Sequence, residues 1–327
     1  MRSSSAALRA LSTVYGALAA ARNRLYDTGV LRPTRVPGVV VSVGNIEAGG
    51  TGKTPFVMAL AGGLAARGVN VAVVTRGYKG RIRGPVHVRP GHTSLEVGDE
   101  ALLMALSLAR VPVVKSPDRV RGALFARARF GAEAILLDDA FQHRRIHRDL
   151  DIVLVARDLP KERLLPAGML REPAGSLARA HHVIAMKGCP LPYPKADLAP
   201  VCLVDTRWRT APLELVRDED VLAFCAVGSP GHFFETAGTL CRVVDTIAFA
   251  DHHRYTAADA RAIAERAARA GYVLTTEKDL VRMEPGMFGE LEGRLFALRV
   301  ALSMEGLEEI EDEIQRMVET RRVHGQG

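Results

Sequence analysis

Cysteine and aromatic residues are scarce in this sequence of 327 residues. Its four cysteines form no Cys-x-x-Cys pair, and their spacing matches neither a zinc site nor a dense disulfide scaffold. They are Cys189, Cys202, Cys225 and Cys241. Isolated cysteines of this kind are typical of small core residues in a reducing compartment. Aromatic residues make up only 5% of the chain, but a hydrophobic content of 48% is enough to bury a core. A disordered or fibrous protein is therefore excluded.

Internal repeats and low-complexity tracts are absent as well. A chain of this length is expected to form about two ordinary domains. Acidic residues are fewer than basic residues, which leaves a formal net charge of +7. A basic protein favours anionic partners such as nucleotides, nucleic acid or an acidic membrane surface. An arginine-rich composition alone would give the same charge.

The N-terminal segment has no apolar run long enough to cross a bilayer. Polar residues within residues 1–21 also weaken the hydrophobic region that a signal peptide requires. Apolar residues instead recur at helical spacing, at Leu8, Leu11, Tyr15, Leu18 and Leu25. Residues 1–30 are therefore predicted to form an amphipathic helix. Such a helix either packs on the adjoining domain or lies in a membrane interface.

Short apolar runs alternate with helical segments over residues 31–212, which we predict to be the first domain. The expected strands are residues 39–43, 71–75, 134–137, 152–156 and 183–186. Helices are expected over residues 55–67 and 98–110. This alternation predicts an α/β fold with a mostly parallel sheet and helices on both faces. The proline-rich stretch of residues 188–212 is interpreted as strand and linker at the end of this domain.

Residues 213–327 are predicted to form a second, smaller α/β domain. Its expected elements are strands over residues 221–227, 242–249 and 272–275, and helices over residues 257–270 and 307–321. The same alternation of apolar runs and helical patterns supports these elements.

A glycine-rich loop directly follows the first strand. It reads Gly49, Gly50, Thr51, Gly52, Lys53, Thr54. Backbone N–H groups of such a loop converge on phosphate oxygens, and the following helix N-terminus adds a favourable dipole. Lys53 is expected to meet the β- and γ-phosphates of ATP, and the Thr54 hydroxyl is expected to bind Mg²⁺. The usual pattern has glycine where this chain has Glu47, so the loop is a variant of the P-loop, in a P-loop-type sheet.

Asp138 and Asp139 follow the apolar strand of residues 134–137. A P-loop fold delivers a carboxylate to Mg²⁺ from this position. Two adjacent carboxylates repel each other unless a cation or a donor lies between them. A turn at the end of a strand is the alternative interpretation.

Three further segments carry groups that catalysis can use. Asp99 lies at an expected helix start, where it either supports the helix dipole or acts as a general base. Glu172 lies on a proline-flanked loop and is either an exposed side chain or a further carboxylate near the metal. His252 and His253 follow Asp251 and supply either an acid–base imidazole or a polar turn, because adjacent histidines are poor metal ligands on a helix.

Together these motifs resemble the tetraacyldisaccharide 4′-kinase family of lipid A biosynthesis. The matching segments are VGNIEAGGTGKTP, TRGYKG, VGDE, LLDDAFQH, LLPAGMLREP, FADHH and TEKD. They extend over nearly the whole chain, and their order is specific. Lys79 and Ala140 stand where the family usually has glycine, which affects the expected loop shape and leaves the chemistry in place.

The resemblance implies transfer of the γ-phosphate of ATP to the 4′-hydroxyl of a lipid A disaccharide 1-phosphate precursor. It assigns phosphate and Mg²⁺ positions to Lys53 and Thr54, and carboxylates around nucleotide and Mg²⁺ to Asp138, Asp139 and Glu172.

By the same resemblance, Asp99 is the expected base for the sugar hydroxyl. His252, or alternatively His253, is the histidine that pairs with it. The resemblance also implies a peripheral protein on the cytoplasmic face of the inner membrane. Its partners would be the lipid precursor and an anionic membrane surface, with no nucleic acid.

Two other functions fit parts of the sequence. An ATPase switch of the deviant-Walker type would carry its signature lysine at position 48, where this chain has Ala48. A non-catalytic nucleotide-binding or lipid-binding adaptor would not need Asp99, Asp138 and Asp139 together.

Overall fold

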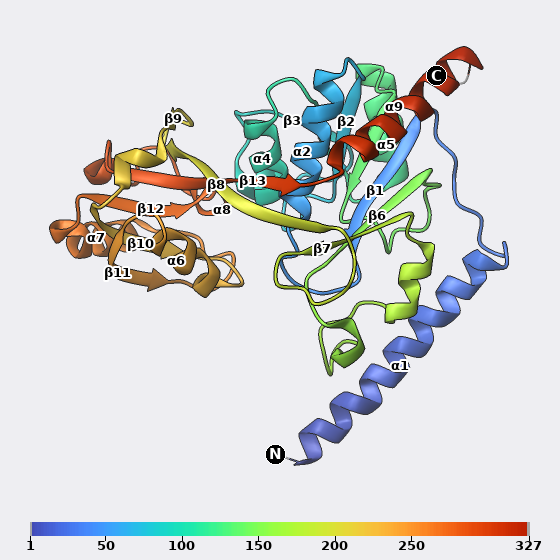
Figure 1. The fold of residues 1–327 in the computed structure, drawn as a ribbon, viewed down its shortest axis with the longest axis horizontal. Helices are drawn as coiled ribbons and strands as arrows, with labels where there is room; N and C mark the ends of the chain where they lie inside the picture. The colour runs from blue at the N-terminus through green and yellow to red at the C-terminus, as the bar shows by residue number, and fades with distance from the viewer. Residues whose placement is uncertain (1, 326–327) are drawn as a thin grey trace.

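One mixed sheet runs through both lobes of the molecule (Figure 1). The computed structural model describes residues 2–325, and within them a 13-stranded sheet has the order β11-β10-β12-β13-β8-β7-β6-β1-β5-β2-β4-β3, with β9 paired to β8. The long strands β8 (Lys195–Asp205) and β13 (Leu295–Met304) pair antiparallel and cross from one lobe to the other. The stretch of residues 188–212, predicted as strand and linker, therefore contains the main connection between the lobes.

The central strands of the first lobe are parallel, and all of their residues except the first two of the last strand are buried. They are β1 (Val39–Asn45), β2 (Val71–Thr75), β4 (Val113–Lys115), β5 (Ala134–Asp138), β6 (Leu150–Val155) and β7 (His182–Met186), with β3 (Val86–Val88) antiparallel at the edge. β1 pairs with β5 on one side and with β6 on the other. The continuous apolar runs of the sequence reflect this burial on both faces. The predicted mostly parallel sheet is confirmed.

Helices cover both faces of this sheet. They are α2 (Lys53–Ala66), α3 (Ser94–Val97), α4 (Asp99–Ser107) and α5 (Arg119–Phe130). The buried side chains of α2 and α4 join one hydrophobic core, and those of α5 join the core on the opposite face. The sequence reasoning missed α5, although Asp118 accepts hydrogen bonds from the first turn and Gly131 ends the helix in the left-handed conformation. Both are ordinary helix-end signals.

The second lobe is a smaller α/β unit. Its elements are β10 (Asp220–Cys225), β11 (Arg242–Ala248), β12 (Tyr272–Thr276), α6 (Pro230–Gly238), α7 (Ala257–Arg266) and α8 (Glu277–Leu280). Short elements complete the chain: β9 (Thr210–Ala211) and the 3-10 helices Leu159–Lys161, Ala174–Arg179, Leu213–Val216, Ala267–Arg269 and Gly289–Leu291. Separate hydrophobic cores lie on the two faces of this part of the sheet.

The last helix, α9 (Leu307–Val323), returns to the first lobe (Figure 1). Ile310 and Ile314 are buried in the same core as α2. Arg67, directly after α2, forms ion pairs with Glu311 and Asp312. The predicted second domain, residues 213–327, therefore includes a helix that packs in the core of the other lobe.

Helix α1 (Arg2–Asp27) extends away from the first lobe (Figure 1). Polar side chains along the helix attach it to the first lobe: Ser12 donates to the Leu164 carbonyl, Tyr15 to the Arg171 carbonyl, and Asn23 to Glu172. Arg22 and Asp27 add ion pairs with Glu172 and Arg144. Much of its apolar stripe is uncovered, and Leu18 is 67% exposed. In the described part of the chain, no helix is long and apolar enough to cross a membrane.

Candidate active site

The glycine-rich loop connects β1 to α2, as the sequence predicted. Gly49 and Gly52 have φ angles of 109° and 73°, a region that side chains with a Cβ rarely adopt. Asn45 Nδ2 donates to Thr51 Oγ1 over 2.9 Å, which ties the start of the loop to its end. Lys53 then begins α2, so the free N–H groups of the first helical turn face the loop.

Glu47 explains why this loop departs from the usual P-loop pattern. Its side chain is fully buried, and Oε1 accepts a 2.9 Å hydrogen bond from the Ala156 backbone at the end of β6. Arg157 Nε lies 3.5 Å from Oε2. Burial raises the pKa of the Glu47 carboxyl. This side chain fastens the loop to the neighbouring strand, and a glycine would leave that connection out.

Asp138 ends β5 and lies almost completely inside the protein. Oδ2 accepts a 2.9 Å hydrogen bond from Thr75, whereas Oδ1 is buried without a hydrogen-bond partner among the described residues. Burial, together with the negative charges of Glu100 and Asp139, raises the pKa of Asp138 to about 6. A buried carboxylate oxygen without a donor is costly unless a cation or a ligand completes the site.

Asp139 follows in a left-handed conformation, with φ of 48°, and turns toward two cations. Lys53 Nζ lies 3.5 Å from Oδ1, and Arg171 Nη1 lies 3.0 Å from both carboxylate oxygens. Burial acts to raise the pKa of Asp139, but the charges of Lys53 and Arg171 outweigh it and lower the pKa. The adjacent aspartates therefore have opposite electrostatic environments, and both cations contact Asp139.

The Glu172 carboxylate contacts side chains of α1 and of Arg179. Oε2 accepts hydrogen bonds from Asn23 and Arg179, each over 2.7 Å, and Arg22 lies 3.6 Å from Oε1. No group of three or more His, Cys, Asp or Glu side chains in the described residues is arranged to hold a metal ion. Glu172 is thus not gathered with Asp138 and Asp139 into one such cluster.

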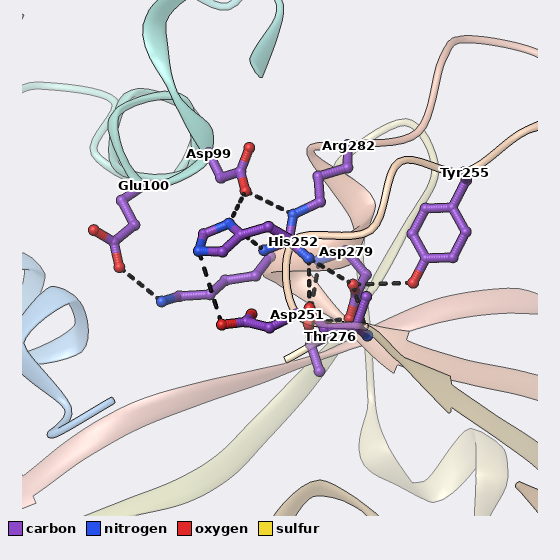
Figure 2. Close-up of polar contacts among 10 residues, drawn as sticks. Asp99, Glu100, Asp251, His252, Tyr255, Thr276, Asp279 and Arg282 are labelled. Carbon is purple, nitrogen blue, oxygen red and sulfur yellow. Dashed lines mark hydrogen bonds and ion pairs between the residues drawn. The ribbon is translucent and has the colours of Figure 1, made fainter. Parts of the chain in front are cut away.

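Asp99 and His252 meet between the lobes (Figure 2). Asp99 begins α4, and its Oδ2 lies 2.9 Å from His252 Nδ1. Arg282 Nε donates to the same oxygen over 2.7 Å. Beside this contact, Glu100 pairs with Lys278 over 2.8 Å. Burial opposes ionisation of Glu100, but Lys278 and Lys53 lower the pKa of its carboxyl, which places the start of α4 within reach of the loop charges.

The geometry distinguishes the two histidines that the sequence left open. His252 faces Asp99, whereas His253 Nε2 bonds to Asp259 over 3.1 Å and its ring stacks on Phe249 at 4.8 Å. Asp259 is part of the capping box of α7. His253 therefore packs within the second lobe, whereas His252 reaches Asp99 of the first lobe.

Sequence reasoning missed two arginines of the site. Arg119 is 2% exposed and donates from Nη2 to the Asp138 carbonyl. Its sequence signal is a cation in the first turn of a helix, which opposes the helix dipole. Arg282 gave no signal, because it follows α8 in a segment that lies far from Asp99 in the sequence.

The residues present fit a nucleotide and a hard divalent cation. The loop offers backbone N–H groups and Lys53, and the buried Thr54 lies in the first turn of α2. Asp138 Oδ1 is an unpartnered oxygen of the kind that Mg²⁺ binds. Mg²⁺ is usually held by one or two carboxylates together with phosphates of the substrate, so a complete protein cage is not required.

A sequence model of the family described as tetraacyldisaccharide-1-P 4′-kinase (LpxK) matches residues 4–319. The chain belongs to this family. It is 38% identical over 329 residues to the tetraacyldisaccharide 4′-kinase of Koribacter versatilis, a match that covers 95% of this chain and 99% of that protein. It is 34% identical over 310 residues to the Aquifex aeolicus tetraacyldisaccharide 4′-kinase, covering 90% of this chain and 93% of the relative.

A solved member of the family has the same fold. The crystal structure of LpxK from Aquifex aeolicus, described as an apo form in complex with ATP, superposes with a TM-score of 0.81 and 32% sequence identity. The match covers 96% of this chain and 99% of that one. The resemblance drawn from the seven sequence segments is confirmed, and so is the predicted α/β fold of both lobes.

Proposed function

We propose that this chain is an ATP-dependent kinase that transfers the γ-phosphate to the 4′-hydroxyl of tetraacyldisaccharide 1-phosphate in lipid A biosynthesis. The observation that carries the proposal is the meeting of Asp99 and His252 across the lobes, next to the phosphate loop of Lys53. Phosphoryl transfer requires mainly positioning and neutralisation of charge. Two lobes around one site also allow water, a competing acceptor, to be excluded.

The loop residues Gly49–Thr54 would hold the phosphates of ATP, with their backbone N–H groups and Lys53 as donors. Thr54, Asp138 and Asp139 would hold Mg²⁺, which would neutralise the negative charge that develops during phosphoryl transfer. Lys53 forms an ion pair with Asp139 here. When a nucleotide binds, its phosphates would replace Asp139 as the partner of Lys53. A role for Glu172 at the metal stays a prediction, since Asn23 and Arg179 hold its carboxylate.

Asp99 is proposed as the group that accepts the proton of the acceptor hydroxyl. Both of its hydrogen bonds, from His252 and Arg282, end on Oδ2. The other oxygen, Oδ1, remains for the hydroxyl. His252 would then orient Asp99, in the way that a base and its hydrogen-bonded partner act as one unit.

The position at the cytoplasmic face of the inner membrane is also a proposal. Leu11, Val14 and Leu18 of α1 are exposed by 57%, 58% and 67%, and the chain carries a formal net charge of +7. An apolar helix face on a basic protein favours the interface of an anionic leaflet, where the lipid acceptor resides. Nucleic acid is not among the proposed partners.

The test measures transfer of radiolabelled phosphate from ATP to purified tetraacyldisaccharide 1-phosphate in detergent micelles with Mg²⁺. We expect a bisphosphorylated lipid that disappears without Mg²⁺ and with Lys53→Ala. Lys161→Ala, on an 84% exposed side chain of the same lobe, is the matched control and should keep wild-type activity. Hydrolysis of ATP without a lipid product would instead support a switch ATPase. Nucleotide binding without either product would support an adaptor.

A further inference from the structure

Arg282 is an almost completely buried cation at the junction of the lobes (Figure 2). Its side chain is 3% exposed, and each of its three side-chain nitrogens faces a polar atom of the protein. Nε donates to Asp99, Nη1 to the Ala226 carbonyl and Asp279, and Nη2 lies 3.3 Å from His252 Nδ1. One guanidinium thus touches both members of the Asp99–His252 pair and is anchored in the second lobe.

The anchor is a buried carboxylate that accepts several hydrogen bonds. Asp279 is fully buried and accepts from Arg282, the Tyr255 hydroxyl, the Thr276 hydroxyl and the Ala226 backbone N–H. A planar guanidinium bound at Nη1 in this way presents Nε and Nη2 in one direction only. The Arg282 side chain is therefore already ordered before substrate binds, so substrate binding does not incur that entropy cost.

The same backbone carbonyl also fixes His252. The Ala226 oxygen accepts from the His252 N–H over 3.2 Å and from Arg282 Nη1 over 2.7 Å. His252 has a φ of 61°, a left-handed conformation that is strained for a residue with a side chain. The His252 backbone and the Arg282 guanidinium are thus held relative to each other by one atom of the second lobe.

This arrangement restricts where the ring carries a proton. Arg282 Nη2 can only donate, and an ionised Asp99 can only accept. A bare Nδ1 would set two lone pairs against each other over the 2.9 Å to Asp99, whereas a protonated Nδ1 leaves the longer 3.3 Å approach of Arg282 Nη2 without an acceptor. The shorter contact decides, so Nδ1 carries the proton and donates to Oδ2, and Arg282 Nη2 makes no hydrogen bond to the ring. Arg282 Nε keeps Oδ2 at that position from its other side.

We propose that Arg282 is a positioning residue for phosphoryl transfer, which orients Asp99 and, by holding Oδ2 against His252, favours the Nδ1-protonated form of the ring. The proposal rests on the proposed kinase function and assigns no contact between Arg282 and substrate. It assigns the second lobe a role in the reaction, because Arg282 and His252 contact Asp99 only when that lobe packs against α4.

The experiment compares Arg282→Met and Arg282→Lys with Arg266→Met as the control. Arg266 makes a similar two-point contact with Asp245 in the same lobe, but on the surface and away from Asp99. A misplaced reacting group lowers turnover on the order of 100-fold, so we expect kcat of Arg282→Met to fall by about that factor. The KM values for ATP and lipid should stay within about threefold, since ground-state binding is untouched.

Arg282→Lys keeps the charge but cannot supply both donors of the fork, so it should restore little of the lost kcat. ¹⁵N NMR of labelled His252 is the second measurement and requires no turnover. It should show a proton on Nδ1 in the wild type and a mixed population in both Arg282 variants.

Near-native kcat in Arg282→Lys, or a loss confined to KM, would overturn the positioning role. An unchanged His252 spectrum in a folded Arg282→Lys protein would do the same, and this readout remains if Arg282→Met does not fold. If the wild type forms no bisphosphorylated lipid, the proposed function fails, while the spectrum still decides the assignment of Arg282.

Discussion

Replacing Asp138 with asparagine should stabilise the nucleotide-free fold at pH 8 while abolishing phosphoryl transfer. Burial and neighbouring carboxylates raise the pKa of Asp138 from 3.8 to about 6, so the folded protein binds this proton more tightly than the unfolded chain does. The ionised form therefore destabilises the fold above about pH 6, by about 3 kcal/mol. This destabilisation disappears as the pH falls from 6 toward 4.

The assay is urea unfolding of the wild type and Asp138→Asn at pH 8 and pH 5, with EDTA and without nucleotide. In Asp138→Asn an uncharged amide occupies the place of the carboxyl group, whose Oδ1 has no hydrogen-bond partner. The amide does not titrate, so its own effect on the unfolding free energy is the same at both pH values. The difference in unfolding free energy between variant and wild type should therefore be about 1.4 kcal/mol larger at pH 8 than at pH 5, as linkage requires. The variant should show no lipid phosphorylation at either pH.

Asp139→Asn is the matched control because it neighbours Asp138 and has the opposite electrostatic environment. The charges of Lys53 and Arg171 overcome burial and lower the pKa of Asp139 below 3.8, so its ionised form stabilises the fold above that pH. Asp139→Asn should destabilise the protein equally at pH 5 and pH 8. The reasoning is refuted if Asp138→Asn changes stability by the same amount at both pH values, or if it destabilises the protein more at pH 8.

Two further predictions concern the histidines and α1. His252→Ala should lower kcat with an unchanged Tm. His253→Ala should lower Tm by a few degrees and keep kcat, because it removes a hydrogen bond and a ring contact worth about 1 kcal/mol. Steady-state kinetics and thermal melts of both variants test this prediction. The reverse pattern would exchange the roles of the two histidines. Deleting residues 1–27 should weaken association with anionic vesicles in a flotation assay. Leu11→Asp with Leu18→Asp should weaken it equally while keeping the Asn23–Glu172 contact, and unchanged flotation would mean that α1 only packs on the protein.

The local part of the site could be predicted because its residues are contiguous. A glycine-rich turn between a strand and a helix is determined by neighbours in the sequence, and so are Asp138 and Asp139 at the end of a buried strand. The parallel sheet followed from the same apolar runs. The helix of residues 119–130 was missed, since its alternating arginines hide the apolar face that packs on the sheet.

Contacts between distant segments followed only from the tertiary structure. The distinction between His252 and His253 depends on which ring reaches Asp99, and His252 is 153 positions from Asp99 in the chain. Arg282 is 183 positions from Asp99. Helix α9 lies with the first lobe because its apolar face and two acidic residues match α2 and Arg67.

The sequence by itself determined the glycine-rich loop between a strand and a helix, the strand-end aspartates, the α/β class and the family, since each depends on local pattern or on the order of short motifs. The tertiary structure decided which titratable groups share a site and how each is charged. Burial and through-space charge set the opposite pKa directions of Asp138 and Asp139. Neither quantity is a property of neighbouring residues along the chain, because both depend on the distances that folding brings about.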